Sequence, residues 1–251
     1  MTFSTQTLTG ILCGTLMQTL VWAQPSHPPL SIYASAYGFS TQWQDQKGFL
    51  PLSYALDVPY SNSLDHVKMA HTVYLDVAKG PLGVYYDKQY YKASVDDRIE
   101  QFPARINVKM ARQSIGTYLK VHDGQRSLDE PFLTLAPTIG VHLTEIDVDV
   151  KADVMGQTLT ASRSASWHEP YIGARFAYNI NRHWVLFGQI NAGNRHSREQ
   201  VAYVAYRSKL FNQPINVRLG YRRLDQKHIK DDFIWDITEK NLMLGFSIQL
   251  L

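Results

Sequence analysis

The closing segment of the chain alternates between apolar positions and small or polar ones. The apolar set is Leu242, Leu244, Phe246, Ile248 and Leu250, and the set between them is Met243, Gly245, Ser247 and Gln249. A period of two residues is that of a β-strand with one apolar face. An open apolar edge promotes aggregation in water, whereas a closed transmembrane barrel pairs its last strand with its first. The pattern therefore predicts a membrane barrel.

The same period, together with the intervening turn residues, predicts about ten strands. The first eight run over about 31–43, 67–78, 82–92, 105–121, 132–150, 167–180, 183–193 and 200–211. The ninth begins at 215 and ends before a loop at 226, and the tenth is the closing segment. Eight strands remain if two of these segments are loop hairpins. The apolar positions change phase near Gln113 and near Glu145, which predicts a β-bulge at the first of these sites. We expect Ile106, Val108 and Met110 to face outward.

The connections between the predicted strands fall into two classes. Those after the second, sixth and eighth strands are very short, whereas those after the first (44–66), third, fifth and ninth (226–240) are longer and charged. Short periplasmic turns and longer external loops alternate in this way. The sequence thus predicts an all-β, antiparallel, up-and-down transmembrane barrel with both termini on the periplasmic side.

The first residues predict export. Residues 8–23 are free of charge and end in Val21-Trp22-Ala23, which resembles the A-x-A pattern of a signal-peptidase site. The stretch is too short to span a bilayer comfortably. We expect a signal peptide over residues 1–23, cleaved near Ala23, and a barrel domain over 24–251, with a retained N-terminal anchor as the alternative. The single cysteine, Cys13, lies in the leader, so the mature chain would have no thiol chemistry.

Composition agrees with a barrel and excludes other classes. The mean hydropathy of −0.25 is that of a soluble protein, but a barrel escapes this index because lipid-facing residues alternate with polar ones. The 15 Tyr, 10 Phe and 5 Trp suit the aromatic girdles at membrane boundaries. A net charge of +3 is too small and too mixed to indicate nucleic-acid binding.

Two features resemble those of small outer-membrane barrel proteins of Gram-negative bacteria. Gly245, Phe246, Ile248 and Leu250 match their C-terminal membrane-insertion signal, although the closing residue is Leu where Phe is commonest. The segment 167–176 and the triplet 220–222 resemble the strand style of these largely uncharacterised proteins. The resemblance implies an outer-membrane location and insertion by the barrel-assembly machinery. We expect a monomer without cofactor or metal, with outer-membrane lipid and lipopolysaccharide as partners.

If the apolar rows face lipid, the opposite rows bring charged residues into the lumen. These are Lys68, Asp76, Asp87, Arg105, Lys109, Asp147, Asp149, Arg175, Arg207, Lys209, Arg218 and Arg222. The interior of so small a barrel is narrow, and an unpaired buried charge is strongly destabilising. We therefore expect paired charges that plug the lumen, which favours a structural or surface-interaction role. The excess of Arg and Lys leaves a narrow, anion-leaning channel as an alternative.

An outer-membrane hydrolase of omptin or lipid-A-modifying type is a further alternative. Histidines that adjoin carboxylates or hydroxyls are His228 with Asp231 and Asp232, His168 with Glu169, and His196 with Ser197 and Glu199. Such a pair can serve as a general base. The spacings do not match an omptin motif. In lipid-A deacylases one residue separates the His and the Ser, so both lie on one strand face, whereas His196 and Ser197 are adjacent and would lie on opposite faces. We therefore assign no catalytic residue, and these histidines and His66 lack metal-ligand spacing.

Two questions stay open at the level of sequence. The segment 228–235 mixes charges with aromatic residues, so it can contact lipopolysaccharide phosphates or a partner protein. The favoured alternative is that Phe233, Ile234 and Trp235 belong to the next strand and to the external aromatic girdle. A secreted, lipocalin-like barrel with its apolar rows turned inward is the rival fold, because alternation alone does not say which row faces the core.

Overall fold

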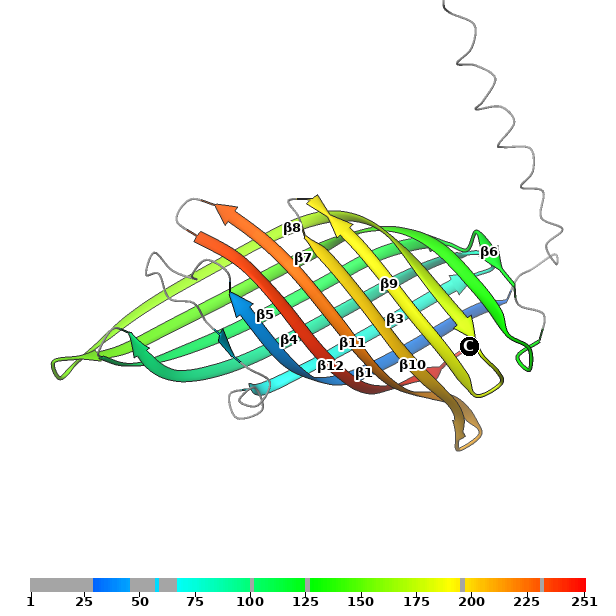
Figure 1. Ribbon diagram of the computed structural model, residues 1–251, viewed down its shortest axis with the longest axis horizontal. Coiled ribbons are helices and arrows are strands. Elements are labelled where there is room, and N and C mark those ends of the chain that lie inside the picture. Colours follow the sequence, from blue (N-terminus) through cyan, green and yellow to red (C-terminus); the bar gives the residue numbers. More distant parts are fainter. Residues whose placement is uncertain are drawn as a thin grey trace, which may run out of the picture.

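The computed structural model describes residues 29–45, 57–58, 67–99, 102–124, 127–194, 197–230 and 233–251. Within these residues, ten long antiparallel strands close into a barrel (Figure 1), which confirms the predicted fold class. They are β1 (Leu30–Asp45), β3 (Val67–Lys79), β4 (Leu82–Ile99), β5 (Phe102–Leu119), β7 (Phe132–Val154), β8 (Gln157–Asn179), β9 (Trp184–Gly193), β10 (Arg198–Leu210), β11 (Gln213–Lys230) and β12 (Phe233–Gln249). The short strands β2 (Asp57–Val58) and β6 (His122–Asp123) pair with β1 and β7. Among the described residues, no helix is long and apolar enough to cross a membrane.

The barrel closes where β1 meets β12. Their ladder runs from the pair Tyr33 and Gln249 to the pair Asp45 and Ile237. The backbone N–H of Leu250 adds a hydrogen bond of 2.8 Å to the carbonyl oxygen of Ile32. The apolar closing strand is therefore paired on both sides, with β1 and with β11, and offers no open edge along its length.

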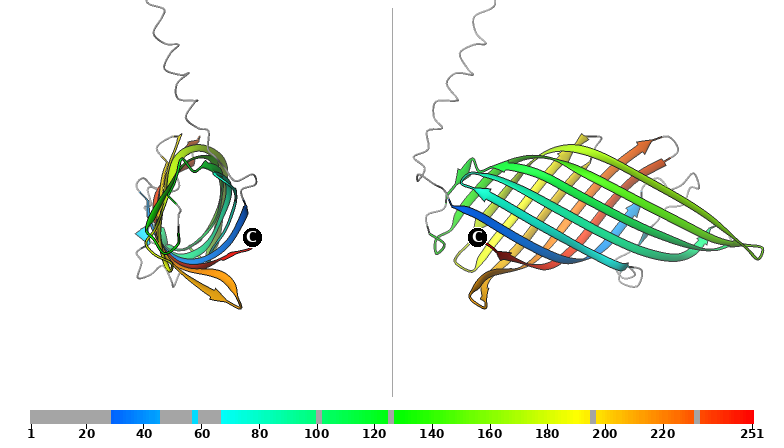
Figure 2. Two further views of the ribbon diagram at one scale, coloured as in Figure 1. Left: turned by 90° about the vertical axis from the view of Figure 1, so that its right-hand side faces the viewer. Right: turned by 180° about the vertical axis from the view of Figure 1, so that it is seen from behind.

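The two ends of the barrel are built differently. At the end that holds the start of β1 and the end of β12, β10 and β11 are joined by a two-residue turn at Phe211 and Asn212 (Figure 2). At the opposite end, β7 and β8 extend furthest and reverse at Met155 and Gly156. Positive φ angles at both residues of each turn give the twist that a two-residue hairpin needs.

Several predicted long loops are strands. The stretch expected as a loop at 226–240 is instead paired along its described part, from Gln226 to Lys230 on β11 and from Phe233 to Lys240 on β12, and 231–232 lie outside the described residues. The expected loop between the fifth and sixth predicted strands is likewise the β7–β8 ladder, which pairs to Val154 and Gln157. Charged and polar residues mark these stretches as loops in the sequence, but cross-strand pairing keeps them in the sheet. The predicted loop at 44–66 lies mostly outside the described residues.

Large apolar side chains form a continuous band on the outside of the barrel, which we call the apolar belt. Its members include Val73, Leu75, Val84, Ile115, Leu135, Ile139, Ile172, Phe176, Leu186, Ile190, Leu219, Leu244 and Phe246, all exposed. Ile139 is 58% exposed and Leu244 is 62% exposed. Facing inward at this level are polar residues such as Asp76, Thr138 and Arg175. Apolar residues outside and polar residues inside are the arrangement of a membrane barrel.

Towards the β7–β8 turn the apolar residues lie on the inner face of the barrel and the charged residues lie on the outer face. The register of the strands does not change where this exchange occurs. The β5–β7 ladder keeps one register through Gln113, paired with Leu143, and Lys109, paired with Asp147. The predicted bulge near Gln113 is therefore wrong, and so is the outward position of Ile106, Val108 and Met110, which are buried inside. The apolar positions change phase because the surroundings of the strand change from an apolar exterior to an aqueous one.

The predicted signal peptide at 1–23 lies outside the described residues. The described chain from Leu30 onward forms one barrel, so a single domain accounts for all of the long strands. The cleavage site near Ala23 stays a prediction.

Candidate functional site

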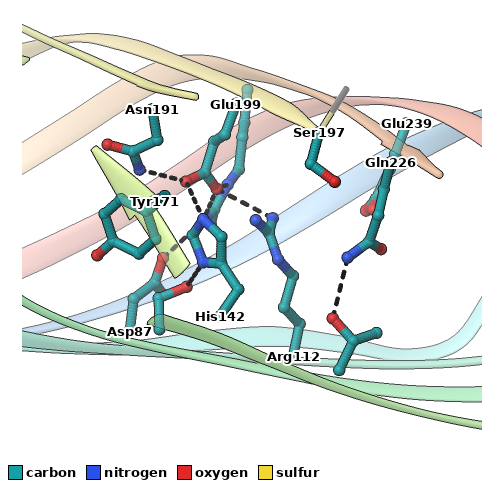
Figure 3. Close-up of polar contacts among 12 residues, drawn as sticks. Asp87, Arg112, His142, Tyr171, Asn191, Ser197, Glu199, Gln226 and Glu239 are labelled. Atoms are coloured by element: carbon teal, nitrogen blue, oxygen red, sulfur yellow. Dashed lines mark hydrogen bonds and ion pairs between the residues drawn. The ribbon is translucent and has the colours of Figure 1, made fainter. Parts of the chain in front are cut away.

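The interior of the barrel is filled by layers of side chains, and the middle layer is an ion network centred on Glu199 (Figure 3). The Oε1 atom of Glu199 accepts hydrogen bonds from Nε of Arg222 at 2.7 Å and from Nη1 of Arg112 at 3.1 Å. Its Oε2 atom accepts one from Nδ2 of Asn191 at 2.7 Å. Nη2 of Arg222 also lies 2.7 Å from Oδ2 of Asp87. These residues come from β4, β5, β9, β10 and β11, so the network crosses the lumen.

His142 joins this layer in an arrangement that resembles a hydrolase triad. Its Nδ1 atom lies 2.7 Å from Oγ of Ser114, and its Nε2 atom lies 3.8 Å from Oε2 of Glu199. The ring of His142 stacks on Tyr171, with 4.1 Å between the ring centroids. Both oxygens of Glu199 are already occupied by Arg112, Arg222 and Asn191, and Ser114 is buried. Ser114, His142 and Glu199 are therefore buried members of the ion network, with Glu199 held by two guanidinium groups.

A second layer lies towards the end that holds the C-terminus, and it surrounds two guanidinium groups with aromatic rings. Nη2 of Arg175 lies 3.0 Å from Oδ2 of Asp76, and the hydroxyl of Tyr118 donates to Oδ1 of Asp76 at 2.7 Å. The guanidinium carbon of Arg175 stands 4.3 Å from the centroid of the Tyr118 ring, within cation–π range. Arg218 similarly lies over the ring of Tyr203 at 4.8 Å.

An apolar cluster fills the barrel on the other side of the ion network. Tyr91, Met110, Ile146 and Trp235 belong to it, and each is almost completely buried. The cluster draws its members from β4, β5, β7 and β12, so it packs opposite walls of the barrel together. Phe39, Ala70 and Trp167 pack around it. The favoured assignment of Trp235 to a strand holds, but its ring points inward and does not join an external girdle.

Between the ion network and the aromatic layer lies a cavity of about 40 Å³. Its walls include Tyr37, Tyr85, Asp87, Ser114 and Tyr203. One water molecule needs roughly 10–15 Å³ of such space, so this cavity holds only a few. The ion network borders the cavity on one side and the aromatic layer borders it on the other.

The structure places half of the predicted lumen charges inside the barrel. Asp76, Asp87, Arg175, Arg218 and Arg222 are buried there, and Arg207 is half-buried near the end of β10. Lys209 occupies the same row as Arg207 but is exposed at the end of the strand. The side chain of Lys68 lies outside the described residues.

Four of the predicted lumen charges lie on the outer surface instead. Arg105, Lys109, Asp147 and Asp149 project from β5 and β7 beyond the apolar belt. Nε of Arg105 forms an exposed ion pair of 2.6 Å with Oδ1 of Asp96. The prediction assumed that apolar rows always face lipid, whereas at this level the apolar row fills the interior.

Sequence reasoning missed three central residues of the network. The predicted change of phase near Gln113 leaves the orientation of Arg112 undefined. An unbroken period of two, counted from Ser114, places Arg112 on the inward face. The sequence pattern singles out Glu199 only as a neighbour of His196, and it does not single out His142. All three residues are found when the alternation of inward and outward positions is continued along each strand without a change of phase.

Of the predicted histidine pairs, the described residues include one complete pair, His168 with Glu169, and the structure places its two side chains on opposite faces of β8. His168 points outward and is exposed, whereas Glu169 is buried and accepts a hydrogen bond of 2.6 Å from Oγ of Ser197. His228 is buried and stacks on Trp167 with 4.3 Å between ring centroids. His66, His196, Asp231 and Asp232 lie outside the described residues. Among the residues described, no group of three or more His, Cys, Asp or Glu is placed to hold a metal ion.

The residues of the predicted insertion signal lie on both faces of β12. Phe246 and Leu250 project outward and are exposed, and Ile248 shares their row. Gly245 is on the inward row, where a Cβ atom would collide with the carbonyl of Ala36 and the ring of Tyr37. A glycine at this position therefore lets the β1 strand and Tyr37 pack closely against β12.

Comparison with known proteins gives likeness of shape and no family. No family model and no curated protein matches the chain. Among solved structures, the attachment invasion locus protein Ail of Yersinia pestis is 12% identical with a TM-score of 0.40, covering 88% of this chain and 99% of Ail. The outer-membrane protease OmpT of Escherichia coli is 9% identical with a TM-score of 0.47, covering 90% and 98%. The outer-membrane protein OprG of Pseudomonas aeruginosa is 11% identical with a TM-score of 0.39, covering 89% and 97%. At these levels no activity carries over to this chain.

Proposed function

We propose that this protein is an integral outer-membrane barrel with a sealed lumen, which acts through its external surface as a structural or interaction platform. The observation that carries the proposal is the ion pair between Arg222 and Asp87, which joins opposite walls of the lumen at 2.7 Å. The apolar cluster around Met110 and Trp235 closes the barrel a second time.

The apolar belt supports a membrane location. A continuous band of exposed Ile, Leu, Val and Phe side chains would drive aggregation in water, but it is stable against lipid acyl chains. The lipocalin-like alternative needs an apolar interior at the same level, where the chain instead has Asp76, Arg175 and Arg222. The resemblance of residues 242–250 to a membrane-insertion signal supports the outer membrane and the barrel-assembly machinery.

The charged outer surface beyond the belt supports an orientation with the β7–β8 hairpin outside the cell. Glu145 and Asp147 on β7, and Arg223 and Lys227 on β11, project where the outer surface has become polar. The turns at the other end, together with the start of β1 and the end of β12, would then face the periplasm. Lipopolysaccharide would surround the external edge of the belt, and the barrel would insert as a single copy.

The hairpin also supports a role in interactions. β8 pairs with β9 only from Tyr171 onward, so among the described residues the stretch 157–166 has β7 as its one strand partner. The side chains of residues 157–164 are exposed on both faces of this ribbon. An exposed strand edge can add a strand from another polypeptide. We propose that this ribbon, residues 150–166, is the part that meets a partner.

The two rival functions receive less support from the geometry. A channel needs a continuous path, and the filled layers on either side of the 40 Å³ cavity interrupt it. A hydrolase needs a nucleophile that a substrate can reach, and Ser114 beside His142 is enclosed.

Protease treatment of intact cells tests the orientation and the exposure of the ribbon. Trypsin added outside should cut after Lys151 and Arg163, both exposed on the ribbon, and leave the rest of the barrel intact. The matched control is Arg182, which is exposed in the β8–β9 turn and should be cut only after the outer membrane is opened. Cleavage at Arg182 in intact cells, with the ribbon protected, would overturn the proposed orientation.

A further inference from the structure

The apolar belt is interrupted by a groove of about 350 Å³ on the outer surface of β8, β9 and β10. Its floor is made of the small residues Ala174, Gly188 and Ala202, and its walls include Phe176, Ile190 and Tyr221. This volume lies at the lower end of the range for small-molecule sites, about 300–1,000 Å³. Small residues therefore leave a hollow in the belt, on the face that would meet the acyl chains.

The groove is a product of three small residues in neighbouring positions. Gly188 pairs with Phe176 on β8 and with Ala202 on β10, and Ala174, two residues before Phe176, pairs with Ile190 on β9. The small residues Ala174, Gly188 and Ala202 therefore lie close together on the outer faces of three neighbouring strands. A Cβ atom at Gly188 would collide with the ring of Phe176, which lies across this glycine. The ring therefore bounds the hollow on the side of β8, while Ala202 leaves it open towards β10 and β11.

Cations stand at the external edge of the groove. Gln200, which lines the groove, pairs across the ladder with Arg223, and Arg223 pairs with Lys240. Arg198, the first residue of β10 after the external turn, projects from the same outer face. The carboxylate of Asp225 forms an ion pair of 3.1 Å with Arg223. In the β10–β11 ladder, Asp225 is the residue opposite Arg198. Arg198, Arg223 and Lys240 thus occupy neighbouring positions on the outer face where the belt ends, with Asp225 among them.

An apolar hollow below a cluster of cations matches an amphipathic ligand with an anionic head. We propose that this groove binds one lipid A molecule of the external leaflet, with an acyl chain over Ala174 and Ala202 and a phosphate near Arg198 and Arg223. Arginine is suited to phosphate because its planar guanidinium donates two parallel hydrogen bonds. The external position of Arg198 selects the outer leaflet, whose lipid carries phosphates. The inference rests on the proposed membrane location and orientation.

Native mass spectrometry of the full barrel, extracted from outer membranes in mild detergent, tests the groove. The wild-type barrel should retain one lipid A molecule. Ala202→Trp fills the hollow and should lower retention by at least about tenfold, the equivalent of 1.4 kcal/mol. The control Val204→Trp adds the same ring to the same face of β10, two residues outside the groove, and should retain lipid A like the wild type.

The cations are tested separately by the double variant Arg198→Gln/Arg223→Gln, which should also lose retention. Its control, Lys88→Gln, removes an exposed cation on the outer face of β4, away from the groove. Equal retention in Ala202→Trp and Val204→Trp, a dimer of the chain in place of a lipid adduct, or equal retention of added phosphatidylglycerol would each overturn the inference. A heat-induced shift on detergent gels shows in the same samples that the barrel is folded. Absence of the lipid adduct from the folded, correctly oriented wild-type barrel would therefore count against the groove and not against the proposed function.

Discussion

Arg222 and Asp87 lie on strands that are not neighbours, yet their side chains meet across the lumen with 2.7 Å between Nη2 and Oδ2. The two residues are 135 positions apart in the sequence. Arg222 also bonds Glu199 on β10, and Glu199 bonds Arg112 on β5. The walls of the barrel are thus connected through its centre by ion pairs and hydrogen bonds.

Glu199→Gln should destabilise the barrel strongly. The carboxylate is 3% exposed and forms ion pairs with Arg112 and Arg222. Its loss would leave the buried Arg112 without its carboxylate partner, whereas Arg222 would keep Asp87. Loss of one partner from such a network costs roughly 3–5 kcal/mol. The measurement is urea unfolding of the barrel in detergent. Asp96→Asn, which breaks the exposed pair with Arg105, is the control and should leave the midpoint unchanged. An equal midpoint for Glu199→Gln would mean that the network does not stabilise the fold.

Lys109 and Met110 test the exchange of faces beyond the belt. They are adjacent on β5, but Met110 is 1% exposed inside the apolar cluster and Lys109 points outward. Met110→Asp should prevent folding because it buries an unpaired charge. Lys109→Asp should fold like the wild type, since the new carboxylate is in water. Refolding yield, read from the heat-induced shift on a detergent gel, distinguishes them. Failure of Lys109→Asp alone would restore the opposite arrangement, with Lys109 in the lumen.

The position of the membrane boundary on β7 can be located by cysteine labelling. Ile139 and Asp147 share the outward row of this strand, the first within the apolar belt and the second beyond it. In lipid vesicles, Ile139→Cys should resist a charged maleimide, whereas Asp147→Cys should react quickly. Detergent should make both sites accessible, which controls for reactivity. Rapid labelling of Ile139→Cys in vesicles would show that the belt is not covered by lipid.

The sequence predicts much of the fold where one rule holds along a whole strand. On β9, Trp184, Leu186 and Ile190 face outward while Gln189 and Asn191 face the lumen, as alternation predicts. The closing strand and its pairing with β1 follow the same rule. Alternation fixes which residues share a face, and in the belt the apolar face turns outward because lipid lies there.

The candidate site was harder to predict, for a physical reason. On β5, Ile106 and Met110 are apolar and buried, whereas Ile115, of opposite parity, is apolar and exposed. All three side chains lie in an apolar environment. That environment is on the outside of the strand within the membrane and on the inside of the barrel beyond it. The sequence alone does not show at which residue of the strand the exterior changes from lipid to water. The inward position of Arg112 is therefore not predicted. The contact between Arg112 and Glu199 also spans 87 positions, which no local pattern encodes.

Single-channel recording of the refolded mature barrel in a planar bilayer tests the sealed lumen most directly. The ion network and the apolar cluster predict a silent bilayer, with no discrete current steps at low or high salt. A heat-induced shift on a detergent gel and protease resistance of the reconstituted barrel show that silence is not failed insertion. Discrete, anion-selective steps that fall when Arg218 and Arg222 are replaced by Gln would contradict the account and identify the protein as a channel.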